Sequence, residues 1–364
     1  MQTVQLSPKV SILVPICNVE KYLAECLNSL VNQSLKDIEI ICINDGSTDN
    51  SLQIIQEYAQ KDTRIKIIDK PNSGYGDSMN KGLELAQGEY IGIVESDDVA
   101  SKDMFEKLYA LAIKNDLDLV KSDFYYYYSQ KNQARHAGRI SKKNVGKVFS
   151  VRDAASVLSI VPSIWSAIYK REFLNAHNIR FLPTPGASYQ DTSFAFKTMS
   201  LAKKMMFTNK AYLYYRQDNE NSSVKSKGKV YSICDEWNEI TRFLNERPEI
   251  KKVVNAEKLI TQFKAYRYNT MRISDEYRED FVEVFAKTFN EFKSDNYFDL
   301  SKFRTSDKKD LNLLLNDKQS YIKYIKQRVA KNEQKAKRKK LFSVKISSTR
   351  VSIVLFGKQV VEIG

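Results

Sequence analysis

Residues 10–23 read VSILVPICNVEKYL, and this stretch combines two patterns. Its first half is an apolar, β-branched run that ends at Pro15, which is typical of a buried strand. From Leu23 onward, apolar residues recur at helical spacing as far as Val31. The stretch therefore predicts a strand that leads through a short polar loop into a helix.

The alternation of strand and helix continues after this stretch. Further apolar runs fall at residues 38–43, 65–68 and 90–94, with helical patterns between them. This rhythm favours an α/β fold with a mainly parallel sheet and helices on both faces. Such sheets bind ligands at the carboxyl ends of their strands. Asn18, Asp45 and the acidic cluster at residues 95–98 each follow a strand directly, so we expect them to line one crevice.

The composition restricts the chemistry of this crevice. The 364 residues include only two histidines, and the four cysteines form no C-x-x-C pair. A histidine-rich metal site is thereby excluded, and the chemistry is expected to depend on carboxylates. A carboxylate cluster suits a hard cation, which could neutralise a diphosphate leaving group. A separate carboxylate, Asp191, could deprotonate an attacking hydroxyl.

Four motifs occur in a characteristic order: residues 10–23, NDGSTD at 44–49, NKG at 80–82 and ESDD at 95–98. Together they closely resemble the nucleotide-sugar domain of family 2 glycosyltransferases, which have the GT-A fold. The resemblance extends over roughly residues 8 to 225. It implies an inverting displacement at the anomeric carbon, in which positioning and charge stabilisation supply most of the acceleration.

The resemblance also assigns roles to individual residues. It implies donor contacts for Pro15, Asn18, Glu20, Asp45, Asn80, Lys81 and Asp97. Asp97 and Asp98 match the D-x-D element that holds Mn²⁺ or Mg²⁺. Two of these residues could instead have purely structural roles. Asp45 could stabilise the turn at Gly46, and Lys81 could lie on a helix surface.

Asp191 matches the general base of the family, although it follows Gln190 where a glutamate is usual. Its alternative role is to cap the helix that begins there. Trp165 and Arg216 match segments that border the acceptor, although core packing would equally explain Trp165. The resemblance favours a UDP-sugar donor, with glucose or galactose ahead of N-acetylglucosamine. The expected acceptor is a lipid-linked or protein-linked glycan of a capsule, surface polysaccharide or glycoprotein.

Other function classes fit less well. No G-x-G-x-x-G follows the first strand, which argues against a nicotinamide-dependent oxidoreductase. The run Tyr125 to Tyr128 would alternate between the faces of a strand, so it forms no single stacking platform and we expect no nucleic-acid partner. Gln190 leaves open a catalytically silent partner subunit with the same fold.

We expect three parts: a GT-A domain at residues 1–225, a helical domain at 226–340 and a β-hairpin tail at 341–364, with its turn at Phe356-Gly357-Lys358. The formal net charge is +14, and a basic run at residues 335–340 contributes to it. This run could be solvated surface, contact a partner, or bind an anionic membrane at about 1 kcal/mol per basic residue. The strand-like tail offers an edge that could pair in a homo-oligomer.

The sequence also bears on localisation. No apolar run reaches the roughly 18 residues that a spanning helix needs. The first residues lack the pattern of a signal peptide. We therefore expect a cytoplasmic protein that, if it acts at a membrane, binds peripherally to the inner face.

Overall fold

The computed structural model describes residues 7–219, 229–295, 298–346, 351–355 and 358–363. The chain divides into two compact units, Met1–Gln262 and Phe263–Gly364, whose boundary falls inside helix α8 (Pro248–Arg272). The three-part division at residues 225 and 340 stays a prediction.

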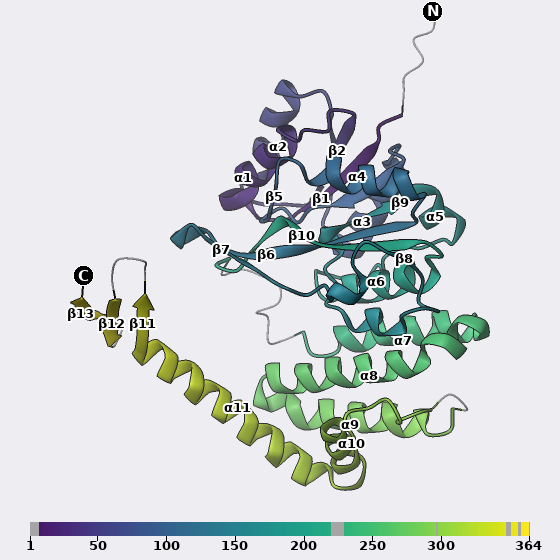
Figure 1. The fold of residues 1–364 in the computed structure, drawn as a ribbon, viewed down its shortest axis with the longest axis vertical. Helices are drawn as coiled ribbons and strands as arrows, with labels where there is room; N and C mark the ends of the chain where they lie inside the picture. The colour runs from purple at the N-terminus through teal and green to yellow at the C-terminus, as the bar shows by residue number, and fades with distance from the viewer. Residues whose placement is uncertain (1–6, 220–228, 296–297, 347–350, 356–357, 364) are drawn as a thin grey trace, which may run out of the picture. The chain divides into compact units, whose positions relative to one another are not determined.

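In the first unit, four parallel strands form one half of a large sheet (Figure 1). They lie in the order β3 (Ile65–Lys70), β2 (Ile38–Asp45), β1 (Val10–Ile16) and β4 (Tyr90–Ile93). The connecting helices are α1 (Glu20–Val31), α2 (Ser51–Lys61) and α3 (Tyr75–Leu85). Every residue of β1 and β2 is buried, so both faces of the sheet are covered there.

The other half of the sheet is mixed. β9 (Ala167–Lys170) runs antiparallel to β4 and to β6 (Leu119–Tyr128), while β10 (Met205–Arg216) runs parallel to β6. The short strands β5 (Val99–Ala100), β7 (Gln133–His136) and β8 (Val148–Phe149) pair antiparallel with β10 or β6. The expected α/β fold is confirmed, but parallel pairing does not extend across the whole sheet. The chain enters β9 through two 3-10 turns, Ala155–Ser159 and Ile164–Ser166, and not through a crossover helix.

Two strands are longer than their sequence patterns. The sequence pattern suggests separate strands at residues 118–120 and 124–128, and again at 205–207 and 212–215. The structure joins the first two, from Leu119 onward, in the single strand β6 and the last two in β10. Register shifts between Thr208 and Tyr214 interrupt the pairing of β10 with β6, which explains the break in the apolar pattern. The remaining helices of this unit are α4 (Met104–Asn115), α5 (Arg171–Ala176), α6 (Gln190–Leu201) and α7 (Ser232–Asn245).

The second unit confirms the expected helical C-terminal region. It contains the end of α8 with α9 (Asp275–Phe292), α10 (Thr305–Asn316) and α11 (Lys318–Leu341), packed around aromatic residues such as Phe263, Phe285 and Phe289. The basic run lies in the last turns of α11. Among the described helices, none combines the length and apolar composition needed to cross a membrane.

The tail forms three antiparallel strands, which is one more than a hairpin contains. These are β11 (Phe342–Ile346), β12 (Val351–Leu355) and β13 (Lys358–Ile363). The expected turn at Phe356-Gly357 lies outside the described residues.

Candidate active site

The acidic cluster follows β4, as the sequence predicts. Asp98 is fully buried; its Oδ1 accepts a hydrogen bond from the backbone N–H of Arg216 at 2.9 Å. Its Oδ2 is buried without a hydrogen-bond partner among the described residues. Burial, and next the charge of Asp97, raise the pKa of Asp98 well above its usual range. Glu95 accepts a 2.7 Å hydrogen bond from the Tyr75 hydroxyl, and burial raises the pKa of Glu95 to about 8.

This cluster has the properties of a cation site. Asp97 is partly exposed, and its Oδ2 accepts from the Asn219 side chain at 2.7 Å. A divalent cation would satisfy the orphaned oxygen of Asp98 and offset the repulsion between the two carboxylates. In the described residues, no group of three or more His, Cys, Asp or Glu is placed to hold a metal.

Asp191 is the second residue of α6 and is partly exposed. Burial of its carboxyl raises the pKa of Asp191 to about 6, while the Thr192 hydroxyl, which donates at 3.4 Å, and the charge of Lys121 act in the opposite direction. Gln190 is buried and donates to Thr184 Oγ1 at 2.9 Å and to the Gly186 carbonyl at 3.2 Å. The residue that replaces the usual glutamate therefore anchors the loop that precedes α6.

Two charged residues near Asp191 were not among the residues singled out from the sequence. Lys121 on β6 is buried, and its Nζ donates to the Ser163 carbonyl at 2.6 Å and to Ser166 Oγ at 3.0 Å. Burial lowers the pKa of Lys121 to about 7, against the effect of Asp123 and Asp191. A lysine inside an apolar strand was the signal that could have indicated this residue.

Glu236 on α7 is the second of these residues. Its Oε2 accepts from the backbone N–H of Ser193 at 2.9 Å, and its buried Oε1 has no hydrogen-bond partner among the described residues. Burial raises the pKa of Glu236 to about 7, and the negative charge of Asp191 adds to this effect. No local pattern marks Glu236, because only the packing of α7 against α6 brings it to this position.

The loops after β1 and β2 meet at the strand ends, as expected. Asn18 Oδ1 accepts from the backbone N–H of Thr48 at 2.8 Å, and Glu20 Oε2 accepts from that of Asn50 at 2.9 Å. Pro15 is buried within β1. In this structure, Asn18 and Glu20 therefore join the two loops to each other.

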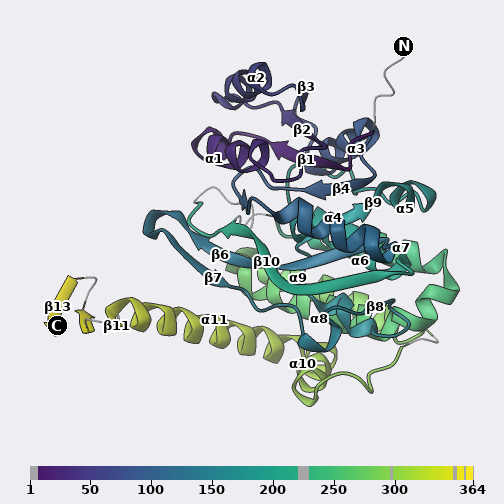
Figure 2. The same cartoon turned by 45° about the horizontal axis from the view of Figure 1, so that its top comes forward.

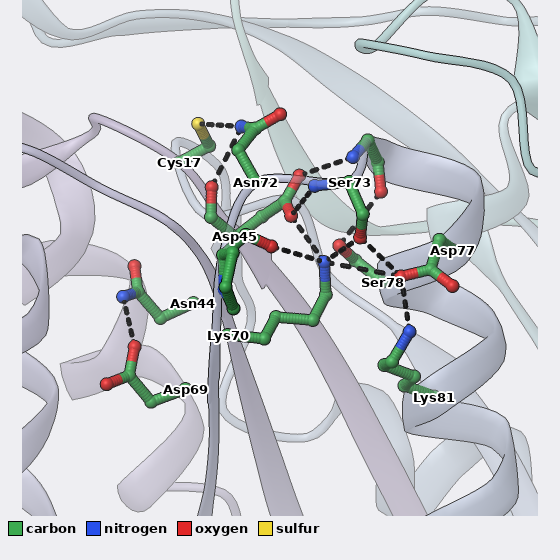
Figure 3. Close-up of polar contacts among 12 residues, drawn as sticks. Cys17, Asn44, Asp45, Asp69, Lys70, Asn72, Ser73, Asp77, Ser78 and Lys81 are labelled. Carbon is green, nitrogen blue, oxygen red and sulfur yellow. Dashed lines mark hydrogen bonds and ion pairs between the residues drawn. The ribbon is translucent and has the colours of Figure 1, made fainter.

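Asp45 lies at the end of β2 and is buried (Figure 3). It accepts from the backbone N–H groups of Ser73 at 2.8 Å and Gly74 at 3.0 Å, and it forms an ion pair with Lys70. These contacts hold the loop that leads into α3. The carboxyl oxygens of Asp45 are thus already engaged within the protein.

The two predicted donor residues on α3 also have protein partners. Lys81 forms an ion pair with Asp77, one turn earlier, at 2.5 Å, and its side chain is 43% exposed (Figure 3). The side chain of Asn80 both donates to the Phe181 carbonyl at 3.0 Å and accepts from the Phe181 N–H at 2.9 Å. Asn80 therefore ties α3 to the segment after α5, while Lys81 remains accessible.

On the predicted acceptor side, Trp165 is buried and stacks on Tyr215 with 4.9 Å between ring centroids. Arg216 is also buried; its Nε donates to the Asp97 carbonyl at 2.6 Å, and its guanidinium pairs with Glu25 at 2.6 Å. Arg216 thereby fixes the backbone of the acidic cluster. Ser222 and Ser223, which belong to the same sequence segment, lie outside the described residues.

The family model "Glycosyl transferase family 2" matches residues 11–181. GlyG of Streptococcus pneumoniae is 32% identical to this chain over 229 residues, which cover 58% of this chain and 72% of GlyG. EpsJ of Bacillus subtilis, described as an uncharacterized glycosyltransferase, is 34% identical over 219 residues, which cover 59% of this chain and only 62% of EpsJ.

Among solved structures, S. aureus TarS 1-349 in complex with UDP-GlcNAc superposes with a TM-score of 0.64. The match covers 95% of this chain and 97% of that chain at 21% identity, so it shows the fold alone. The family model and the identity to GlyG, of which the match covers more than two thirds, show that the chain belongs to glycosyltransferase family 2.

Proposed function

We propose that this protein is an inverting glycosyltransferase that transfers a hexose from a UDP-sugar to a hydroxyl of a glycan acceptor. The observation that carries the proposal is a line of contacts from the acidic cluster to α6, the helix that holds Asp191. Glu95 accepts from the Tyr75 hydroxyl, and the Tyr75 ring packs on Phe181, which stacks on Phe194 of α6. These contacts support a candidate base close to a candidate cation site, which is the arrangement that the direct displacement of a diphosphate requires.

Asp191 is suited to act as the general base. A pKa of about 6 leaves its carboxyl ionised at neutral pH and makes it more basic than an ordinary aspartate. It would take the proton of the acceptor hydroxyl as that oxygen attacks the anomeric carbon from the face opposite the diphosphate. The anchored loop before α6 would hold the carboxyl in position.

The donor would lie along the strand ends. UDP-GlcNAc in the TarS structure supports a uridine nucleotide, and we favour glucose or galactose as the sugar. Pro15, Asn18, Glu20, Asp45, Asn80, Lys81 and Asp97 are the proposed donor contacts. Asp97 and Asp98 would hold Mn²⁺ or Mg²⁺, which when bound neutralises charge on the departing diphosphate.

The acceptor would be a lipid-linked or protein-linked glycan that passes Trp165 and Arg216. The basic run at the end of α11 would allow peripheral binding to the inner face of an anionic membrane. The β tail would allow homo-oligomers to form by strand pairing.

The first experiment measures thermal stability with UDP, GDP and TDP, each with and without Mn²⁺. A ligand at a hundred times its dissociation constant stabilises the folded state by about 2.7 kcal/mol. We expect a shift with UDP that requires Mn²⁺ and is lost in Asp97→Ala and Asp98→Ala. No shift with any nucleotide would contradict the donor site.

The second experiment screens UDP-sugars for turnover. Asp191→Asn should retain the UDP shift and lose transfer, whereas Asp235→Asn, at an exposed position on α7, should retain both. UDP binding by the wild-type protein without transfer of any sugar would favour the alternative, a catalytically silent partner subunit.

A further inference from the structure

The segment after β6, residues 129–148, has an unbalanced charge, and we call it the basic hairpin. It contains Lys131, Arg135, Arg139, Lys142, Lys143 and Lys147, and it contains no Asp or Glu. All of these side chains are exposed, and within the described structure none of them pairs with a carboxylate. The carboxylates of Asp123 and Asp218 bind backbone N–H groups of this segment and leave the side chains of these lysines and arginines unpaired. A concentration of exposed cations that form no ion pairs favours an anionic ligand.

Two arginines of the basic hairpin are held around one aromatic ring. β7 pairs with β6 so that Arg135 lies opposite Tyr126, and its guanidinium is 5.2 Å from the centroid of the Tyr126 ring. Arg139 lies 5.7 Å from the same centroid and donates to the Tyr126 hydroxyl at 2.6 Å. The buried carboxyl of Asp123 accepts from the backbone N–H of Arg139 at 2.8 Å, which holds the segment after β7 against β6.

This arginine pair is connected to the candidate active site through neighbouring aromatic rings. The ring centroids of Tyr126 and Tyr215 are 6.4 Å apart, and the Tyr215 ring stacks on Trp165. The next residue along β10, Arg216, donates its N–H to Asp98. Figures 1 and 2 show the tip of the β6–β7 hairpin extending beyond the rest of the sheet. An acceptor chain that approaches the acidic cluster from this side would therefore pass the two arginines and the partly exposed rings of Tyr126 and Tyr215.

We propose that the acceptor is an anionic glycan and that the basic hairpin binds its charged groups. The inference rests on the proposed function, because it concerns the acceptor of that same site. The cations are distributed along the hairpin, which fits a chain with repeated oxyanions better than a single charged group. The guanidinium group of arginine binds oxyanions through two parallel hydrogen bonds. Partly exposed tyrosines present both an apolar ring and a polar hydroxyl to a sugar.

The test measures binding of a fluorescein-labelled oligogalacturonate to the full chain by fluorescence anisotropy. A labelled maltooligosaccharide of equal length is the neutral comparison. We expect the wild-type protein to bind the anionic oligomer more tightly, and Arg135→Ala/Arg139→Ala to weaken that binding about tenfold. Lys107→Ala/Lys114→Ala, which removes two exposed charges from α4, should leave the affinity unchanged.

The same proteins are tested for stabilisation by UDP with Mn²⁺, which separates this inference from the proposed function. If UDP stabilises all three proteins but the wild type does not prefer the anionic oligomer, the inference is wrong and the donor site stands. If no protein responds to UDP, the proposed function fails whatever the glycan result. The inference would also be overturned if the wild-type protein bound oligothymidylate or phosphatidylglycerol vesicles more tightly than the oligogalacturonate and the arginine variant lost that binding. That result would favour a nucleic acid or a membrane as the partner.

Discussion

Glu236→Gln should stabilise the protein above neutral pH, because the wild-type carboxyl is buried with one oxygen unpartnered. Glutamine keeps an acceptor for the N–H of Ser193 and removes the buried charge. Burial raises the pKa of Glu236 from 4.5 to about 7, and each pKa unit corresponds to about 1.4 kcal/mol. Ionisation of this carboxyl in the folded state therefore costs about 3 kcal/mol once the pH exceeds its folded pKa.

Between pH 4.5 and pH 7 the folded state retains the proton of Glu236 while the unfolded state has lost it, so the stability of the wild type falls as the pH rises. The variant lacks this dependence. The difference in unfolding free energy should be small at pH 4.5 and should reach about 3 kcal/mol in favour of the variant at pH 8.

Urea unfolding monitored by tryptophan fluorescence is the suitable assay. The only tryptophans of the chain, Trp165 and Trp237, both belong to the first unit, so the signal reports the unit that contains Glu236. Glu249→Gln, an exposed position on the neighbouring helix, is the matched control and should show no effect. The reasoning is refuted if Glu236→Gln is no more stable than the wild type at pH 8, or if the difference does not change with pH.

Three further predictions concern the site and its loops. The transfer rate should fall below about pH 6 as Asp191 takes up a proton, so a flat kcat profile between pH 5 and 8 would contradict its role as base. Lys121→Met removes a positive charge that lowers the pKa of Asp191, so the acid limb of that profile should move to higher pH; a shift to lower pH would exclude this effect. Gly74→Ala should destabilise the protein by about 1–3 kcal/mol in urea unfolding, because Gly74 has a φ of 95° and a Cβ there would lie 2.8 Å from the Thr184 carbonyl oxygen. Unchanged stability would mean that the loop adapts.

Local patterns were sufficient to predict much of the fold. The run 10–16 and the helix from Gln190 were recognisable because burial and backbone hydrogen bonding repeat with the periods of a strand and a helix. The direction of β9 was not recognisable, since its four residues carry no signal for antiparallel pairing. The sequence also did not predict that β6 and β10 are each one continuous strand, because polar residues and bulges interrupt their apolar patterns.

The candidate site, like the fold, was predictable from the sequence only in part. The motifs by themselves determined which carboxylates to examine, Asp97, Asp98 and Asp191, because each lies beside a recognisable strand end or helix start. Only the tertiary structure revealed that Glu236 and Lys121 lie near Asp191 and that Asp45 is already engaged by its own loop. The pKa of a carboxyl depends on desolvation and on charges contributed by segments far apart in the chain, and no local pattern of residues encodes that proximity.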